Sequence, residues 1–313
     1  MTQPYRIVFM GTPAFAVPAL ERLVSAGHTI LQVVTQPDRP KGRGKAVVFS
    51  PVKQMALELG RPVMQPLSVR TSEFSEVLSG LNPDFLVVVA YGQVLPRQVL
   101  SVPHIAAVNI HASLLPRYRG PAPIQWAIIN REVETGVTLM LMDEGLDTGD
   151  MLTSASISIR PDDTSGALHD RLAVLGADLL VRTLERFDIH RKNAAPQLHD
   201  RATYAPMLKK SDGHLDWRKP AEDIEALIRG LTPWPGAFCF IEGKRIKIFR
   251  ATPKIIRTDA LPGTVIPGFP DELTVATGCH ALIVQELQGE SGKRLSIRDF
   301  LRGHPISPGT VLS

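Results

Sequence analysis

The chain has 313 residues, 44% of them hydrophobic and 21% charged, which is typical of a soluble globular protein and long enough for two domains. It has no apolar run of the ~18 residues that a membrane-spanning helix needs, and its start lacks the features of a signal peptide. The net charge of +4 is modest, and the basic excess lies after residue 188, so contact with a polyanion is permitted but not required.

Residues 1–189 alternate between apolar strand patterns and amphipathic helix patterns. Strand patterns fall at residues 6–10, 30–34, 85–90, 106–110 and 137–141. The runs are nearly continuous in apolar residues, as expected for strands that are covered on both faces. A long helix is expected after Thr164, whose hydroxyl is a candidate N-cap. The alternation predicts an α/β domain with a Rossmann-like, mostly parallel sheet.

Residues 190–209 are polar and aperiodic and are predicted to be a linker. Residues 210–313 then change in character. One helix pattern is followed by short strand patterns that glycine and proline separate. These lie at residues 237–241, 245–249, 263–266, 273–276 and 281–285. Several short strands at close spacing predict a second, smaller domain, an OB-like β-barrel.

Two polar residues, Asn109 and His111, occur at the end of the apolar run 106–110. Because side chains alternate along a strand, both project from one face. Ligands of open α/β sheets bind beyond the carboxyl ends of the strands, so an amide and an imidazole should meet in the expected crevice. Each could instead satisfy a neighbouring backbone group, but a same-face pair favours a functional site.

An acidic turn follows the strand pattern 137–141. It runs from Met142 to Asp150 and contains Asp143 and Asp147. A carboxylate from this turn could pair with His111 and favour the charged imidazolium. A solvated acidic turn is the plain alternative, and the spacing of an EF-hand calcium loop is absent.

Other candidate motifs carry less weight. Gly11-Thr12-Pro13 is not the G-x-G-x-x-G of a dinucleotide-binding turn. Lys41-Gly42-Arg43-Gly44-Lys45 lacks P-loop spacing and is either a phosphate-contacting loop or an ordinary surface hairpin. No Cys or His cluster has zinc spacing, and no serine lies in G-x-S-x-G. We therefore expect no metal. The two cysteines, Cys239 and Cys279, are expected to be free thiols of a cytoplasmic protein, which we expect to be a monomer.

The sequence resembles the folate-dependent formyltransferases. The resemblance is carried by Asn109-x-His111, by Ser113-Leu114-Leu115-Pro116-x-Tyr118-Arg119-Gly120 and by the later Asp147. The stretches 7–15, 35–44, 216–217 and 233–237 extend it over nearly the full length, toward the members that act on transfer RNA. One departure is Met207, which stands where a linker lysine is expected.

This resemblance implies a one-carbon transferase. Its donor would be 10-formyltetrahydrofolate, and its acceptor the amino group of methionyl initiator tRNA. Asn109, His111 and Asp147 would be the catalytic residues. The folate site would include Val89, Ala90, Tyr91, Gly92, Ser113, Leu114, Leu115, Pro116 and Asp143. The tRNA contacts would include Arg43, Lys45, Lys209 and Lys210.

Two other functions stay open at this point. A formyltransferase or hydrolase that acts on a small substrate could share Asn109, His111 and Asp147. A catalytically idle RNA-binding protein could use the basic C-terminal domain equally well. The expected barrel and the basic loop argue against a small substrate, and the intact set of catalytic residues argues against an idle protein.

Overall fold

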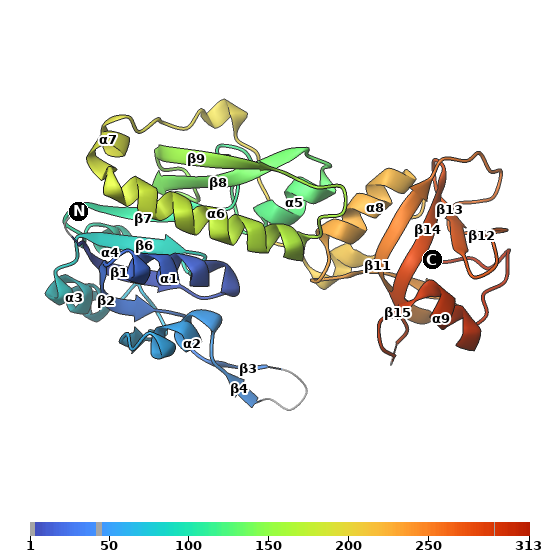
Figure 1. The fold of residues 1–313 in the computed structure, drawn as a ribbon, viewed down its shortest axis with the longest axis horizontal. Helices are drawn as coiled ribbons and strands as arrows, with labels where there is room; N and C mark the ends of the chain where they lie inside the picture. The colour runs from blue at the N-terminus through green and yellow to red at the C-terminus, as the bar shows by residue number, and fades with distance from the viewer. Residues whose placement is uncertain (1–3, 42–45, 291) are drawn as a thin grey trace. The chain divides into compact units, whose positions relative to one another are not determined.

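The computed structural model describes residues 4–41, 46–290 and 292–313 (Figure 1). Contacts divide the chain into two compact units. The N-terminal unit comprises Met1–Pro123, Glu134–Ile157 and His169–Ala205, and the C-terminal unit comprises Ile124–Val133, Ser158–Leu168 and Pro206–Ser313. Two short segments within the first 189 residues therefore group with the C-terminal unit. The domain boundaries expected from the sequence stay a prediction.

The N-terminal unit is built on one seven-stranded sheet of order β5-β2-β1-β6-β7-β8-β9. The strands are β1 (Arg6–Gly11), β2 (Thr29–Val34), β5 (Val63–Met64), β6 (Phe85–Val89), β7 (Ala106–His111), β8 (Glu134–Leu141) and β9 (Met151–Ser158). The pairs from β5 to β7 are parallel, and β8 is antiparallel to β7. The predicted Rossmann-like, mostly parallel sheet is confirmed.

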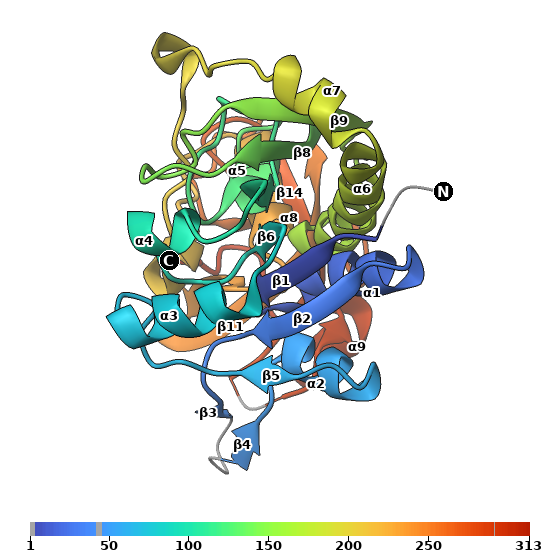
Figure 2. The same cartoon turned by 90° about the vertical axis from the view of Figure 1, so that its left-hand side faces the viewer.

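Helices cover both faces of this sheet (Figure 2). They are α1 (Val17–Ser25), α2 (Pro51–Glu58), α3 (Ser72–Leu81), α4 (Arg97–Leu100), α6 (Ser165–Glu185) and α7 (Phe187–Lys192). On one face, buried side chains of α3 and α4 share a core with Val8 and Met10. On the other face, α6 packs so closely on β7 that a Cβ at Gly176 would lie 2.8 Å from Ile110 Cγ2. Thr164 caps α6 as expected, because its hydroxyl accepts a hydrogen bond from Ala167 N at 3.2 Å.

The C-terminal unit is an antiparallel sheet with helices. Its elements are α5 (Pro123–Ile129), α8 (Ala221–Gly230), β10 (Ala237–Ile241), β11 (Lys244–Lys254), β12 (Val265–Ile266), β13 (Leu273–Ala276), β14 (Ala281–Gln288), β15 (Leu295–Ser296) and α9 (Ile297–Gly303). The sheet order is β10-β11-β14-β13-β12, with β15 on β14. This curled sheet agrees with the predicted OB-like domain.

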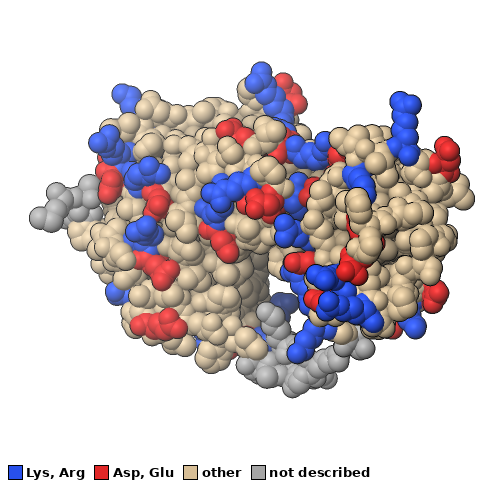
Figure 3. All heavy atoms as spheres, turned by 45° about the vertical axis from the view of Figure 1, so that its right-hand side comes forward, with Lys and Arg blue, Asp and Glu red and all other residues tan. Residues whose placement is uncertain are grey.

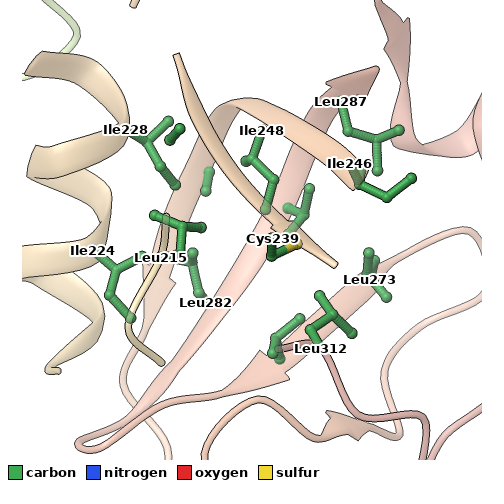
Figure 4. Close-up of a cluster of buried hydrophobic side chains, with 14 of the residues drawn as sticks. Leu215, Ile224, Ile228, Cys239, Ile246, Ile248, Leu273, Leu282, Leu287 and Leu312 are labelled. Carbon is green, nitrogen blue, oxygen red and sulfur yellow. The ribbon is translucent and has the colours of Figure 1, made fainter. Parts of the chain in front are cut away.

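The core of the C-terminal unit joins α8 to the inner face of that sheet (Figure 4). Ile228 from α8 and Leu282 from β14 are fully buried in it. Burying each such side chain stabilises a fold by about 1.5–3 kcal/mol. Cys239 lies in the same core, and its burial raises the pKa of the thiol to about 12. Both cysteines are free, and Cys279 lies at the surface.

Candidate active site

Strand β7 brings Asn109 and His111 to the carboxyl edge of the sheet. Asn109 pairs in register with Val88 of β6, so His111 lies beyond the end of that neighbouring strand. Both residues are buried, at 8% and 6% exposure. The side-chain amide of Asn109 has no hydrogen-bond partner within residues 4–41, 46–290 and 292–313. The amide N–H groups are therefore left free to donate to a ligand oxygen.

Both ring nitrogens of His111 face acceptors. Its Nε2 lies 2.9 Å from the Tyr118 carbonyl, which can only accept, so Nε2 carries a proton. Its Nδ1 lies 3.5 Å from Asp147 Oδ1, an ion-pair distance that is longer than a normal hydrogen bond. An acceptor therefore lies beside each ring nitrogen, and the longer Nδ1 contact is the one that a substrate oxygen could share.

Asp147 reaches this pair from the acidic turn after β8. Its backbone is left-handed, with a φ of 54°, a conformation that aspartate tolerates better than most residues. The carboxylate is fixed on its other side, because Gly120 N donates to Oδ2 at 2.9 Å. The structure thus brings the three predicted catalytic residues together.

The loop after β7 is held by β8. Thr138 donates its hydroxyl to Ser113 O at 2.7 Å and accepts from Leu115 N at 3.1 Å. Ser113 in turn donates to Arg117 O at 2.6 Å. Gly120 has a φ of +107°, which suits glycine, and a Cβ there would lie 3.0 Å from Ala205 O. This loop is therefore packed on both sides.

The first predicted folate-binding segment follows β6. Val89 and Tyr91 are buried, whereas Ala90 and Gly92 are exposed and have φ values of 47° and 95°. The hydroxyl of Tyr91 has no partner in the described part of the chain, and burial raises its pKa to about 12. Thr12 donates to Tyr91 O at 2.9 Å. The exposed positions offer mainly backbone groups to a ligand.

The other predicted folate residues differ in exposure. Ser113 and Leu115 are buried, and Leu114 and Pro116 are half-buried. The Asp143 carboxylate accepts hydrogen bonds from Gly145 N at 3.0 Å and from the Thr148 hydroxyl at 2.7 Å. Asp143 therefore shapes the turn that carries Asp147.

Two residues beside the site were missed by sequence reasoning, Arg119 and Gln197. Arg119 is 2% exposed and Gln197 5%. Segment 195–205, inside the expected linker, packs on the catalytic loop through the bridge between Arg119 and Tyr204 and through Ala205 N, which donates to Arg119 O at 2.7 Å. Arg119 lies within the formyltransferase-like motif, but nothing near Gln197 in the sequence marks it.

The predicted tRNA contacts fall in two places. Lys209 and Lys210 are exposed, at the start of a short 3₁₀ turn (Lys210–Gly213) in the C-terminal unit. Arg43 and Lys45 lie outside the described residues, between β3 (Arg39–Lys41) and β4 (Ala46–Val48).

The hairpin of β3 and β4 is fastened near its base. Lys53 forms an ion pair with Asp38, and Gln65 donates to Asp38 Oδ1 at 2.8 Å. The hydrogen bond from Lys53 is the main cause that lowers the pKa of Asp38. These side-chain bonds therefore hold Asp38, the residue just before β3, in place.

Three further surface and composition features bear on what the protein could bind. Lys and Arg side chains gather on the lower part of the C-terminal unit, with Asp and Glu among them (Figure 3). Within the described ranges, no three His, Cys, Asp or Glu residues are grouped so that they could hold a metal ion. None of the helices formed by those residues is long and apolar enough to cross a membrane.

Comparison with known proteins assigns this chain to a family of transferases. The family model "Formyl transferase" matches residues 5–184, and "Formyl transferase, C-terminal domain" matches residues 207–305. The chain belongs to the formyl transferase family, and it is an enzyme of the transferase class. It is 51% identical over 308 residues to the methionyl-tRNA formyltransferase of Caldanaerobacter subterraneus, covering 98% of this chain and 99% of the relative. It is 50% identical over 307 residues to that of Geotalea uraniireducens, covering 98% and 97%.

Solved structures share the fold at lower identity. A Helicobacter canadensis N-formyltransferase in complex with folinic acid and dTDP-3-aminofucose has a TM-score of 0.65 at 18% identity, covering 90% of this chain and 99% of that one. HypX from Aquifex aeolicus in complex with tetrahydrofolic acid has a TM-score of 0.65 at 17% identity, covering 96% of this chain and 47% of that one. Both show the formyltransferase fold.

Proposed function

We propose that this enzyme transfers the formyl group of 10-formyltetrahydrofolate to the α-amino group of methionyl initiator tRNA. The observation that carries the proposal is the unpartnered Asn109 amide beside His111, which itself faces Asp147 at 3.5 Å. Relatives at about 50% identity over nearly the whole chain are methionyl-tRNA formyltransferases, which supports this acceptor. The structural relatives bound to tetrahydrofolic and folinic acid support a folate-type donor.

In the proposed reaction, the amine nitrogen of the methionyl group attacks the formyl carbon. Negative charge then develops on the formyl oxygen, and the Asn109 amide and His111 Nδ1 donate hydrogen bonds to it. Asp147 keeps His111 charged and takes the proton that the amine loses, directly or through water. The bond from the formyl carbon to the folate nitrogen breaks, and that nitrogen receives the proton as tetrahydrofolate leaves.

The pterin is proposed to bind at residues 89–92 and at Ser113–Pro116, with Asp143 shaping the adjacent turn. Support comes from the position of these residues, which follow the carboxyl ends of β6 and β7 as in other open α/β sheets. Arg43, Lys45, Lys209 and Lys210 are proposed to contact the tRNA. For Arg43 and Lys45 this proposal rests on the sequence alone.

An acceptor competition tests the proposed substrate. The enzyme is given labelled 10-formyltetrahydrofolate with methionyl-tRNA, uncharged tRNA or an amino-sugar nucleotide, and kcat/KM is measured for each. We expect label on methionyl-tRNA alone. Transfer to the amino-sugar nucleotide with a higher kcat/KM would instead assign the enzyme to the small-substrate formyltransferases.

Replacing Asp147 with asparagine should lower kcat by about 10²-fold or more, because the side chain keeps an oxygen for Gly120 N but loses the charge that holds the His111 proton. Asparagine also tolerates the left-handed backbone, so the fold should persist. Steady-state turnover with saturating substrates measures the effect. Asp150→Asn, an exposed acid in the same turn, is the control. Undiminished turnover of Asp147→Asn would remove this residue from the mechanism.

The double variant Lys209→Ala/Lys210→Ala should weaken tRNA binding. Each phosphate contact that a lysine makes adds about one unit to the salt slope of log affinity, so the slope should fall by about two. Binding of fluorescent tRNA is measured from about 50 to 200 mM salt. Affinity for the folate should not change. An unaltered slope would place the tRNA elsewhere.

A further inference from the structure

The side chain of Gln197 forms hydrogen bonds on both sides of its amide. Its Oε1 accepts from Arg119 Nε at 3.0 Å and from Arg119 Nη2 at 2.8 Å. Its Nε2 donates to Asp147 O at 2.9 Å and to Gly149 O at 2.8 Å. A primary amide has two donors and two acceptor lone pairs, so this one is saturated.

These partners fix the orientation of the amide. A guanidinium only donates and a carbonyl only accepts, so the amide cannot turn over without losing every one of these bonds. Arg119 itself is buried and is steadied from the opposite side by His199, whose Nδ1 lies 3.3 Å from Nη1. The rigid fork of an arginine suits such a paired contact better than a lysine.

The fixed amide of Gln197 restrains Asp147. Its carbonyl is held by Gln197 and its carboxylate by Gly120 N, so the residue is fastened at two points in its left-handed conformation. The next anchor, Gly149, lies against β8 so closely that a Cβ would be 1.9 Å from Leu141 O. The turn is thus fixed between β8 and Gln197, with Asp147 aimed at His111.

We propose that Gln197, held by Arg119, is a positioning residue for formyl transfer that acts through Asp147. This inference rests on the proposed function, because it gives Asp147 a role in the reaction. It assigns a task to segment 195–205, which completes the active site instead of only connecting two domains.

The variant Gln197→Glu keeps the acceptor side of the amide and removes its donor side. Its carboxylate still accepts from Arg119 but has no N–H for the carbonyls of Asp147 and Gly149. We expect kcat to fall by about tenfold to a hundredfold, as is usual for a small misplacement of a reacting group, with KM for both substrates close to wild type. The control is Gln98→Glu, which adds the same charge at an exposed glutamine of α4 and should leave turnover unchanged.

A double-mutant cycle with Asp147→Asn identifies the route of the effect. If Gln197 acts through Asp147, the double variant should be no slower than Asp147→Asn alone. A loss that multiplies in full with that of Asp147→Asn would show a general structural role and overturn the proposal, as would wild-type kcat in Gln197→Glu.

Two further results keep the test decisive. If melting shows that Gln197→Glu is unfolded, Arg119→Lys enters the same cycle, because it keeps the buried cation but loses the two-pronged grip on Oε1. If Asp147→Asn turns over normally, Asp147 has no role in the reaction. The inference about Gln197 is then also wrong, because it depends on that role. A slow Asp147→Asn with a normal Gln197→Glu overturns only the inference.

Discussion

Replacing His111 with alanine is expected to lower kcat for formyl transfer by at least about a hundredfold, since removal of one donor from an oxyanion site commonly costs about 10²–10³ in rate. The substitution removes the ring that lies between Tyr118 O and Asp147, and with it one of the two proposed donors to the formyl oxygen. It also leaves the half-buried Asp147 carboxylate without its imidazole partner. Steady-state kcat with both substrates saturating is the measurement.

A matched control is His190→Ala on α7, which should retain wild-type turnover. The next residue, Arg191, donates to Ile105 O beside the start of β7, so this helix lies near the end of the strand opposite to His111. The melting temperature of each variant shows whether the fold is retained. If His111→Ala were folded and kept more than about a tenth of the wild-type kcat, stabilisation of the formyl oxygen by this ring would be excluded.

Replacing Asn109 with alanine is expected to lower kcat by about 10²–10³-fold with little change in KM for the folate. The amide has no hydrogen-bond partner among the described residues, so its removal breaks no hydrogen bond there. The substitution should therefore destabilise only the transition state, in which charge develops on the formyl oxygen, and so lower kcat. The melting temperature should stay close to that of the wild type, because no hydrogen bond among the described residues is lost.

The control for this change is Asn193→Ala, at an exposed position just after α7. The same kinetic assay is run on both variants. A rise in KM for the folate with normal kcat would contradict the prediction and would give Asn109 a role in binding the ground state.

The central strands could be predicted from the sequence because their burial leaves a simple pattern. β1, β6 and β7 are covered on both faces, so they appear as continuous apolar runs. β9 (Met151–Ser158) escaped notice, since it ends the sheet and most of its side chains are exposed or only half-buried. Short elements such as β5 and α4 are too brief to show a period.

The candidate site was predictable to different extents. Asn109 and His111 follow from strand periodicity alone, whereas Asp147 was added by a resemblance to known formyltransferases. Gln197 could not be predicted, because its partners lie 78, 50 and 48 positions away and no local pattern records such contacts. Its segment is polar and aperiodic in sequence, yet its backbone pairs with the catalytic loop.

The most direct test of the proposed function is a single-turnover experiment with enzyme and labelled 10-formyltetrahydrofolate in excess over methionyl-tRNA. The amino acid is then released from the tRNA and scored as formyl-methionine. We predict rapid formation of formyl-methionine by the wild type, and formation slowed at least about a hundredfold by Asn109→Ala, His111→Ala and Asp147→Asn. No formyl-methionine from a wild-type enzyme that binds the folate, or an unchanged rate in all three variants, would contradict the proposed reaction.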